Sequence, residues 1–128
     1  MRKKISVIGE RVEIAHDLSR AADVGQDVRG ADVVVLAGAG DLDEIARSAP
    51  AATIVVTGDG VEDRCKAVYE RLLYPRARII GVVDPADVGP AVESIVLERD
   101  EVHDVIAMDG QGDFVQRSAR LGRGGIRA

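Results

Sequence analysis

Residues 109–115, DGQGDFV, hold side chains that could do chemistry. Two glycines flank Gln111, an aspartate follows, and apolar stretches lie on both sides. Glycine allows a tight turn, so the pattern predicts a hairpin between two strands. Glutamine exchanges no proton near neutral pH, so Gln111 itself offers no general acid or base. The segment is a plain hairpin turn, a place where chemistry is done, or a place where chemistry used to be done.

Glycines also follow three of four apolar runs that are predicted to be strands, at residues 4–9, 31–40, 52–58 and 77–84. In an open α/β sheet, ligands bind outside the carboxyl ends of the strands. Glycine there lets a ligand approach the backbone, but glycine also simply ends strands. The candidate cofactor-binding residues at these ends are Gly9, Gly38, Gly40 and Thr57.

The loop after the first predicted strand does not match a dinucleotide-binding loop. Such a loop needs the pattern G-x-G-x-x-G, and the sequence after Gly9 lacks the second and third glycines. Glu10 and Glu13 stand where a pyrophosphate requires bare amides at a helix N-terminus, and carboxylates repel a phosphate. The sequence therefore predicts no working phosphate cradle.

The sequence also lacks the spacing of a metal site, because His16 and His103 lie far apart and Cys65 is the one cysteine. A single cysteine forms no internal disulfide and suits a reducing cytoplasm, where we expect the protein. We interpret Cys65 as a structural thiol, since it lies in a predicted helix.

The composition narrows the class of protein. The 128 residues suffice for one domain with its own core, and the core must be aliphatic, because aromatic residues make up 2%. A net charge of −5 argues against a nucleic-acid or anionic membrane partner. No apolar run is long enough to cross a membrane. The basic C-terminal stretch RSARLGRGGIRA is either a solvated tail or a docking arm.

Apolar runs alternate with helical patterns along most of the chain. Helices are expected over residues 10–22, 41–50, 61–75 and 90–98, and the last two strand-like runs form a hairpin around the glycine turn. Strands that alternate with helices indicate a parallel sheet. The predicted fold is α/β, with a mostly parallel sheet of about four strands, helices on both faces and a C-terminal β-hairpin.

Several blocks, taken in order, resemble the malate/lactate dehydrogenases. MRKKISVIG with AHDL is similar to the family's first strand and helix, and DVRGADVVVLAGAG to its fourth strand and following loop. APAATIVVTG resembles the segment before the T-N-P turn, and YPRARIIGVVD the start of L-D-x-x-R. DEVHDVIAMDGQGDFV resembles the stretch that ends in G-G-H-G-D, and LGRGGIRA resembles V-G-G-I-P. The resemblance implies a shortened Rossmann-like domain over residues 1–100, with a hairpin and basic Gly-rich tail over 101–128, as one unit.

The departures from the family pattern fall on its functional positions. The family's proton-relay histidine falls on Gln111, while Asp84 matches the aspartate that orients it. The substrate-binding arginine falls on Asp87, which reverses the charge, and the asparagine of T-N-P falls on Gly58. The family's mobile loop, its second and third strands and its ribose-binding acid have no counterpart in the alignment of these blocks. The resemblance thus implies a family member without catalytic residues.

Three functions follow from this resemblance. The first is a non-catalytic structural or regulatory homologue, for which no cofactor is expected. The second is a nucleotide or small-molecule sensor that uses the strand-end glycines. The third is a residual dehydrogenase of 2-hydroxy acids, for which the family implies NAD.

Without the second and third strands, the strand from Lys4 to Gly9 would be an exposed sheet edge. We therefore expect a homodimer paired through that strand, or burial against a full-length relative.

Overall fold

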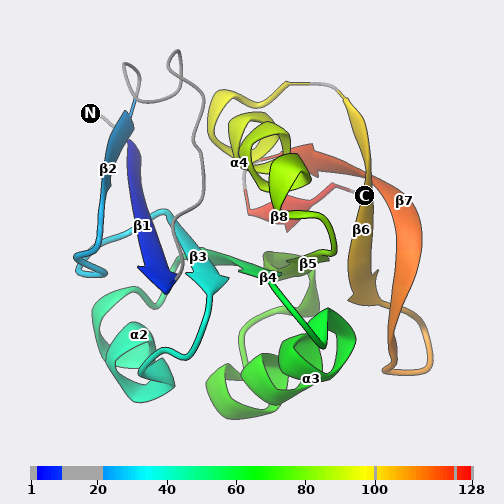
Figure 1. The fold of residues 1–128 in the computed structure, drawn as a ribbon, viewed down its shortest axis with the longest axis horizontal. Coiled ribbons are helices and arrows are strands. Elements are labelled where there is room, and N and C mark those ends of the chain that lie inside the picture. Colours follow the sequence, from blue (N-terminus) through cyan, green and yellow to red (C-terminus); the bar gives the residue numbers. More distant parts are fainter. Residues whose placement is uncertain (1–2, 10–21, 100, 123, 128) are drawn as a thin grey trace.

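In the computed structural model, residues 3–9, 22–99, 101–122 and 124–127 are described (Figure 1). Their strands form one sheet with the order β2-β1-β3-β4-β5-β6-β7-β8. The strands are β1 (Lys3–Gly9), β2 (Ala22–Gly25), β3 (Val33–Ala37), β4 (Thr53–Thr57), β5 (Ile79–Val82), β6 (Val102–Met108), β7 (Phe114–Gly122) and β8 (Gly125–Ile126). The helices are α2 (Leu42–Ser48), α3 (Val61–Leu72) and α4 (Val88–Leu97), with 3-10 turns η1 (Arg76–Arg78) and η2 (Pro85–Asp87).

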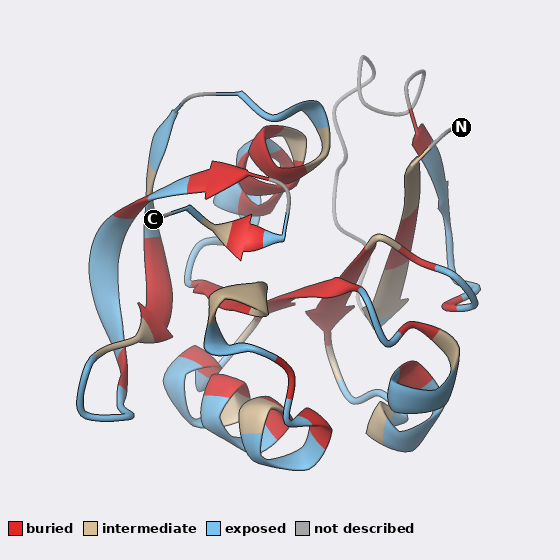
Figure 2. Ribbon diagram, turned by 180° about the vertical axis from the view of Figure 1, so that it is seen from behind, coloured by how far each residue is buried: buried red, intermediate tan, exposed pale blue. Residues whose placement is uncertain are grey.

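The parallel part of the sheet comprises β1 to β5, and its central strands are buried on both faces (Figure 2). Alternate residues of a strand point to opposite faces. Val34 and Leu36 of β3 therefore join a core cluster with α2 and α3, whereas Val33 and Val35 join a second cluster with α4. The predicted α/β fold, with helices on both faces of a mostly parallel sheet, is confirmed.

The predicted edge position of β1 is wrong. β2 pairs parallel with β1, with Lys3 opposite Ala22, and β3 pairs with its other side. The parallel order β2-β1-β3-β4-β5 lacks only the outermost strand of the Rossmann order, so the family's second strand has a counterpart here. The sequence pattern did not predict this strand because three of its four residues are exposed and one is glycine.

The expected homodimer stays a prediction, but the strand from Lys4 to Gly9 cannot mediate it by edge pairing, since both of its sides are taken. The predicted helix over residues 10–22, together with Glu10, Glu13 and His16, lies outside the described residues except at Ala22. None of the helices that the structure describes is long and apolar enough to cross a membrane.

The predicted C-terminal hairpin is confirmed. β6 and β7 pair antiparallel from Val102 opposite Arg120 to Met108 opposite Phe114, around a turn over residues 109–113. The hairpin continues the main sheet, because β6 meets β5 antiparallel with Gly81 opposite Ile106. The rings of Tyr69 and Phe114, with centroids 6.0 Å apart at 63°, also join α3 to β7.

Helix α4 begins earlier than predicted. It begins at Val88 instead of residue 90, so Gly89 and Pro90 both lie in its first turn. The first-turn amides of a helix have no intrahelical acceptor, so a proline there costs no hydrogen bond. The turn η2 leads directly into α4. Asp84 lies at the start of η2, and Asp87 lies at the start of α4.

Candidate functional site

The carboxyl ends of β1 and β3 approach each other closely. Gly9 has a φ of +97°, and a Cβ atom at this position would lie 2.6 Å from the Gly38 backbone nitrogen. Only glycine fits such an approach. A Cβ atom on Gly40 would lie 3.0 Å from Leu36 Cδ2. The structure thus brings Gly9 and Gly38 together, as the topology predicts, and the strand ends pack against each other there.

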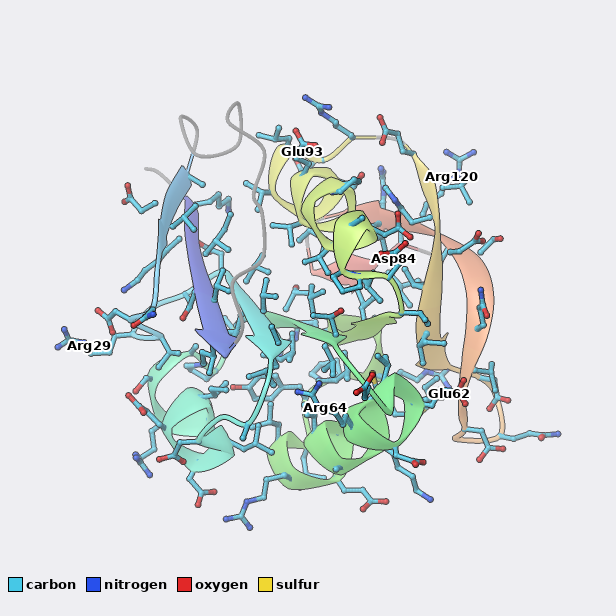
Figure 3. The ribbon with its side chains drawn as sticks, in the orientation of Figure 1. Arg29, Glu62, Arg64, Asp84, Glu93 and Arg120 are labelled. Atoms are coloured by element: carbon cyan, nitrogen blue, oxygen red, sulfur yellow. The ribbon has the colours of Figure 1, made fainter. Side chains whose placement is uncertain are left out.

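Arg64 of α3 reaches the carboxyl ends of β3 and β4 (Figure 3). Its guanidinium donates to the Thr57 carbonyl oxygen, and to the Gly38 carbonyl oxygen at 2.8 Å. A weaker contact of 3.5 Å joins it to the Leu36 carbonyl oxygen. The side chain therefore satisfies strand-end carbonyls and occupies space that a ligand would need in order to reach this backbone.

The sequence did not single out Arg64. It stands in the first turn of an amphipathic helix, where a half-exposed arginine is ordinary. A Cβ atom on Gly58 would lie 2.9 Å from Arg64 Nη1, so the glycine at the family's asparagine position leaves room for the guanidinium. The partners of Arg64 lie up to 28 residues away in the chain. Only the fold brings them together.

Thr57 is buried at the end of β4. Its Oγ1 atom has no hydrogen-bond partner in the described part of the chain, and its carbonyl accepts from Arg64. Thr57 lines neither of the pockets at the strand ends. Gly9, another predicted cofactor-binding residue, lines the pocket beside β2.

That pocket holds about 290 Å³ and lies at the ends of β1 and β2. Gln26, Asp41 and Glu44 supply its polar groups, and none of its described lining residues is a lysine or arginine. Asp41 also caps α2, because its Oδ1 accepts from the Glu44 amide at 3.1 Å. Two carboxylates oppose the binding of a diphosphate but suit hydroxyl groups as hydrogen-bond acceptors.

Asp27 follows β2 by two residues, where a ribose-binding acid stands in dinucleotide-binding domains. Its carboxylate is 3.3 Å from Arg29 Nε and 3.1 Å from Lys4 Nζ. Hydrogen bonds from Arg29, and then from Lys4, hold the pKa of Asp27 well below its usual range. Asp27 is not among the described lining residues of the pocket beside β1, and its carboxylate is engaged by these two cations.

A second pocket of about 470 Å³ lies beyond the ends of β4 and β5, beside the start of α3. Gly58 lines it together with three acids, Asp59, Glu62 and Asp63. Glu62 and Asp63 lie in the first turn of α3, where negative charge stabilises the helix dipole. The same charges repel a carboxylate, so the pocket is unsuited to an anionic 2-oxo acid.

The two residues that the sequence resemblance matches to the family's proton relay lie apart. Asp84 follows the carboxyl end of β5, and its Oδ1 accepts from the Ala86 amide at 3.0 Å. Gln111 lies in the hairpin turn, where its amide donates to Asp109 Oδ1 at 2.8 Å. The Asp109 carbonyl is 3.4 Å from Nη1 of Arg76, which precedes the amino end of β5. Gln111 and Asp84 therefore belong to opposite ends of β5.

Asp87, at the family's arginine position, is exposed between η2 and α4. Its amide donates to the Asp84 carbonyl at 2.9 Å. Asp84 and Asp87 thus start this helical segment. A group of three metal-ligating side chains is absent from the described residues.

A serine and a histidine that the sequence did not connect form a short contact. Ser94 Oγ in α4 lies 2.6 Å from His103 Nε2 in β6. Ser94 is fully buried, and the nearest carboxylate, Glu101, lies 3.8 Å from the same imidazole nitrogen. A catalytic triad requires the acid on the other nitrogen and an accessible nucleophile. The pair therefore joins α4 to β6 rather than forming a nucleophile.

Cys65 is buried against β5, and desolvation raises the pKa of its thiol to about 12. The thiolate is the reactive form of cysteine, and it is negligible near neutral pH at such a pKa. This environment supports the structural interpretation of Cys65.

Neither a protein-family model nor a curated protein matches this chain. Among solved structures, malate dehydrogenase from Picrophilus torridus in its apo form is similar, with a TM-score of 0.81 and 14% identity. The match covers 100% of this chain and 89% of that chain. The fold is malate dehydrogenase-like. At this identity the likeness concerns the fold, and function must be argued from the residues of this malate dehydrogenase-like chain.

Proposed function

We propose that this chain is a malate dehydrogenase-like protein that transfers no hydride and acts as a structural or regulatory homologue. The observation that carries the proposal is the position of Arg64, whose guanidinium binds backbone carbonyls at the ends of β3 and β4. In the dehydrogenase fold this end of the sheet receives the dinucleotide. Here its carbonyls are already satisfied from within the chain.

The charges at the strand ends support the same proposal. The described residues do not fit the diphosphate of NAD, because Asp41 and Glu44 line the pocket beside β1 without a cation. Asp59, Glu62 and Asp63 line the next pocket, where a carboxylate substrate would be repelled. Among the described lining residues, neither pocket offers the arginine fork that recognises such a substrate.

The separation of Asp84 and Gln111 supports it further. Proton transfer needs a titratable group within hydrogen-bond reach of the substrate and a partner that orients it. Asp84 caps η2, and Gln111 lies in a turn at the other end of β5.

A homodimer, or a complex with a full-length relative, remains part of the proposal. Light scattering of the purified chain at micromolar concentration tests self-association.

The pocket beside β1 favours a second candidate, a sensor of an uncharged nucleoside or similar polyhydroxy compound. Gln26, Asp41 and Glu44 can accept or donate to hydroxyl groups, and Val28 and Ile8 supply apolar surface. The volume of about 290 Å³ suits a ligand of this size. Residual NAD-dependent dehydrogenase activity is the third function, and no described residue favours it.

The decisive experiment is a calorimetric titration of the purified protein with NADH, beside ADP, adenosine and malate. We expect no saturable binding of NADH or malate at millimolar concentration, and no oxidation of NADH with 2-oxo acids. Saturable NADH binding with turnover would overturn the proposal. Binding of adenosine alone would support the sensor, provided that Gln26→Ala weakens it and Gln116→Ala, a matched change on β7, does not.

A further inference from the structure

Three arginines converge on a pocket that lies away from the strand-end crevice. The pocket holds about 290 Å³ and is lined by Arg76, Arg117 and Arg127, with Asp109, Gly110 and Ile126 among its other residues. Arg76 belongs to η1, Arg117 to β7, and Arg127 follows β8. The pocket thus forms where the hairpin turn, the amino end of β5 and the C-terminal strand meet.

Two of these guanidiniums reach the backbone at the end of β6 and the start of the hairpin turn. Arg76 Nη1 lies 3.4 Å from the Asp109 carbonyl oxygen, and Arg117 Nη1 lies 3.5 Å from the Met108 carbonyl oxygen. These carbonyls belong to consecutive residues, so the two side chains flank one stretch of backbone. Both contacts are long for hydrogen bonds and therefore weak, and each guanidinium carries five N–H donors. Donors thus remain for a ligand.

Gly122 leaves room for the side chain of Arg127, the third arginine of the pocket. Arg127 folds across Gly122, where a Cβ atom would lie 2.9 Å from Arg127 Cγ. The Arg127 amide also donates to the Arg120 carbonyl at 2.9 Å, which holds the strand end in place. None of the ion pairs found among the described residues involves Arg76, Arg117 or Arg127. Their positive charge is not neutralised by a described carboxylate partner within 4.0 Å.

Asp109 is the acid of the pocket lining, and the turn engages its carboxylate. Its Oδ1 accepts from the amides of Asp113 at 2.9 Å and Gln111 at 2.8 Å. Three guanidiniums and one carboxylate leave a local charge of two positive units, in a chain whose net charge is −5. Such a local excess attracts a dianion.

We propose that this pocket binds a small organic phosphate as its dianion. Guanidinium groups match phosphate oxygens in geometry, and two negative charges balance the local excess. The pocket has room for a short organic portion beside the phosphate, against Ile126 and the side-chain-free backbone of Gly110. A monocarboxylate would leave half of the charge unmatched. This site is independent of the function proposed above, because it uses none of the strand-end residues.

The test is a calorimetric titration of the full chain with glycerol 3-phosphate, beside inorganic phosphate and acetate. We expect saturable binding of glycerol 3-phosphate that weakens with added salt, weaker binding of inorganic phosphate, and none of acetate. Arg117→Gln and Arg76→Gln should each weaken binding at least about tenfold, as the loss of a charge-assisted pair predicts. Circular dichroism checks that each variant is folded.

Arg47→Gln is the matched control, because it removes the same charge from an exposed site on α2. It should leave binding unchanged, and amide NMR shifts on titration should map to residues 76–77, 108–110 and 126–127. Absence of saturable binding would overturn the proposal. So would equal losses in Arg47→Gln and Arg117→Gln, acetate binding as tight as phosphate binding, or shifts confined to residues 58–63.

Discussion

The two ends of β5 carry opposite chemistry. Beyond its carboxyl end lies the larger pocket, lined by Asp59, Glu62 and Asp63, and the nearby Arg64 is bound to backbone carbonyls. Beside its amino end, three arginines without described carboxylate partners meet the hairpin turn. The dehydrogenase fold reserves the first region for ligands, yet the second holds the charge that could bind one. The topology therefore indicates where a ligand site can lie, while the residues at that place determine whether a ligand binds there.

Gly81 joins these two regions, and its substitution should have the largest effect. A Cβ atom there would collide with Val61 and lie 2.8 Å from both Cys65 Sγ and Ile106 Cβ. We expect Gly81→Ala to lower the free energy of unfolding by about 3 kcal/mol, since overpacking forces the sheet and α3 apart. Urea unfolding followed by circular dichroism measures the change.

Gly110→Ala is the matched control for that substitution, because a Cβ atom there would meet nothing within 4 Å. It should change the free energy of unfolding very little. If both variants were equally stable, Gly81 would not be the tight junction between the parallel strands and the hairpin.

Substitutions of Arg64 test whether its side chain stabilises the carboxyl ends of β3 and β4. Arg64→Met should lower the free energy of unfolding by about 2 kcal/mol, because carbonyls at the ends of β3 and β4 lose their donor. Arg64→Lys should recover part of the loss, since one ammonium can reach fewer of these oxygens. Arg71→Met removes an arginine of the same helix from an exposed pair with Asp43 and should matter far less. Equal denaturation midpoints for Arg64→Met and Arg71→Met would contradict a bridging role.

A smaller effect is expected at the contact of α4 with the hairpin. Ser94→Ala should lower the free energy of unfolding by about 1 kcal/mol, because Ser94 is buried and bonds to His103 Nε2 at 2.6 Å. Ser118→Ala breaks an exposed bond of 3.0 Å to Asp104 and should cost less. Thermal melts of both variants at pH 7 compare the two losses of stability. A larger loss in Ser118→Ala than in Ser94→Ala would contradict the stabilising role of the Ser94–His103 contact.

The smallest effect concerns Asp109 in the hairpin turn, through pH. Hydrogen bonds from the backbone amides of Asp113 and Gln111 lower the pKa of Asp109 in the folded protein. Its carboxylate therefore stabilises the fold above the unfolded pKa of about 3.9, and this contribution is lost as the pH falls through the folded value. Asp109→Asn should melt below the wild type at pH 7, with a gap that narrows below about pH 4.

Melting curves from pH 2 to 7 measure that gap, and a constant gap would exclude the carboxylate as its cause. The same variant sharpens the comparison of the two ends of β5. It removes the single acid from the arginine-lined pocket, so glycerol 3-phosphate should bind more tightly to Asp109→Asn than to the wild type.

Much of the fold could be predicted from local patterns. The continuous apolar runs of β3 and β4 predicted buried parallel strands, because strands that are covered on both faces are apolar throughout. The glycine turn between two alternating runs predicted the hairpin of β6 and β7. β2 escaped prediction because a short, exposed strand carries almost no hydrophobic signal. Its absence from the expected fold led directly to the wrong edge position for β1.

By itself, the sequence determined the aliphatic core and, apart from β2, the order of the described strands and helices. These follow from residue type and short-range periodicity, which need no knowledge of distant partners. Only the tertiary structure decided that Arg64 bonds to the Gly38 carbonyl and that Arg76 and Arg117 share a pocket. Such partners are 26 or more residues apart, and their meeting depends on the packing of the whole sheet.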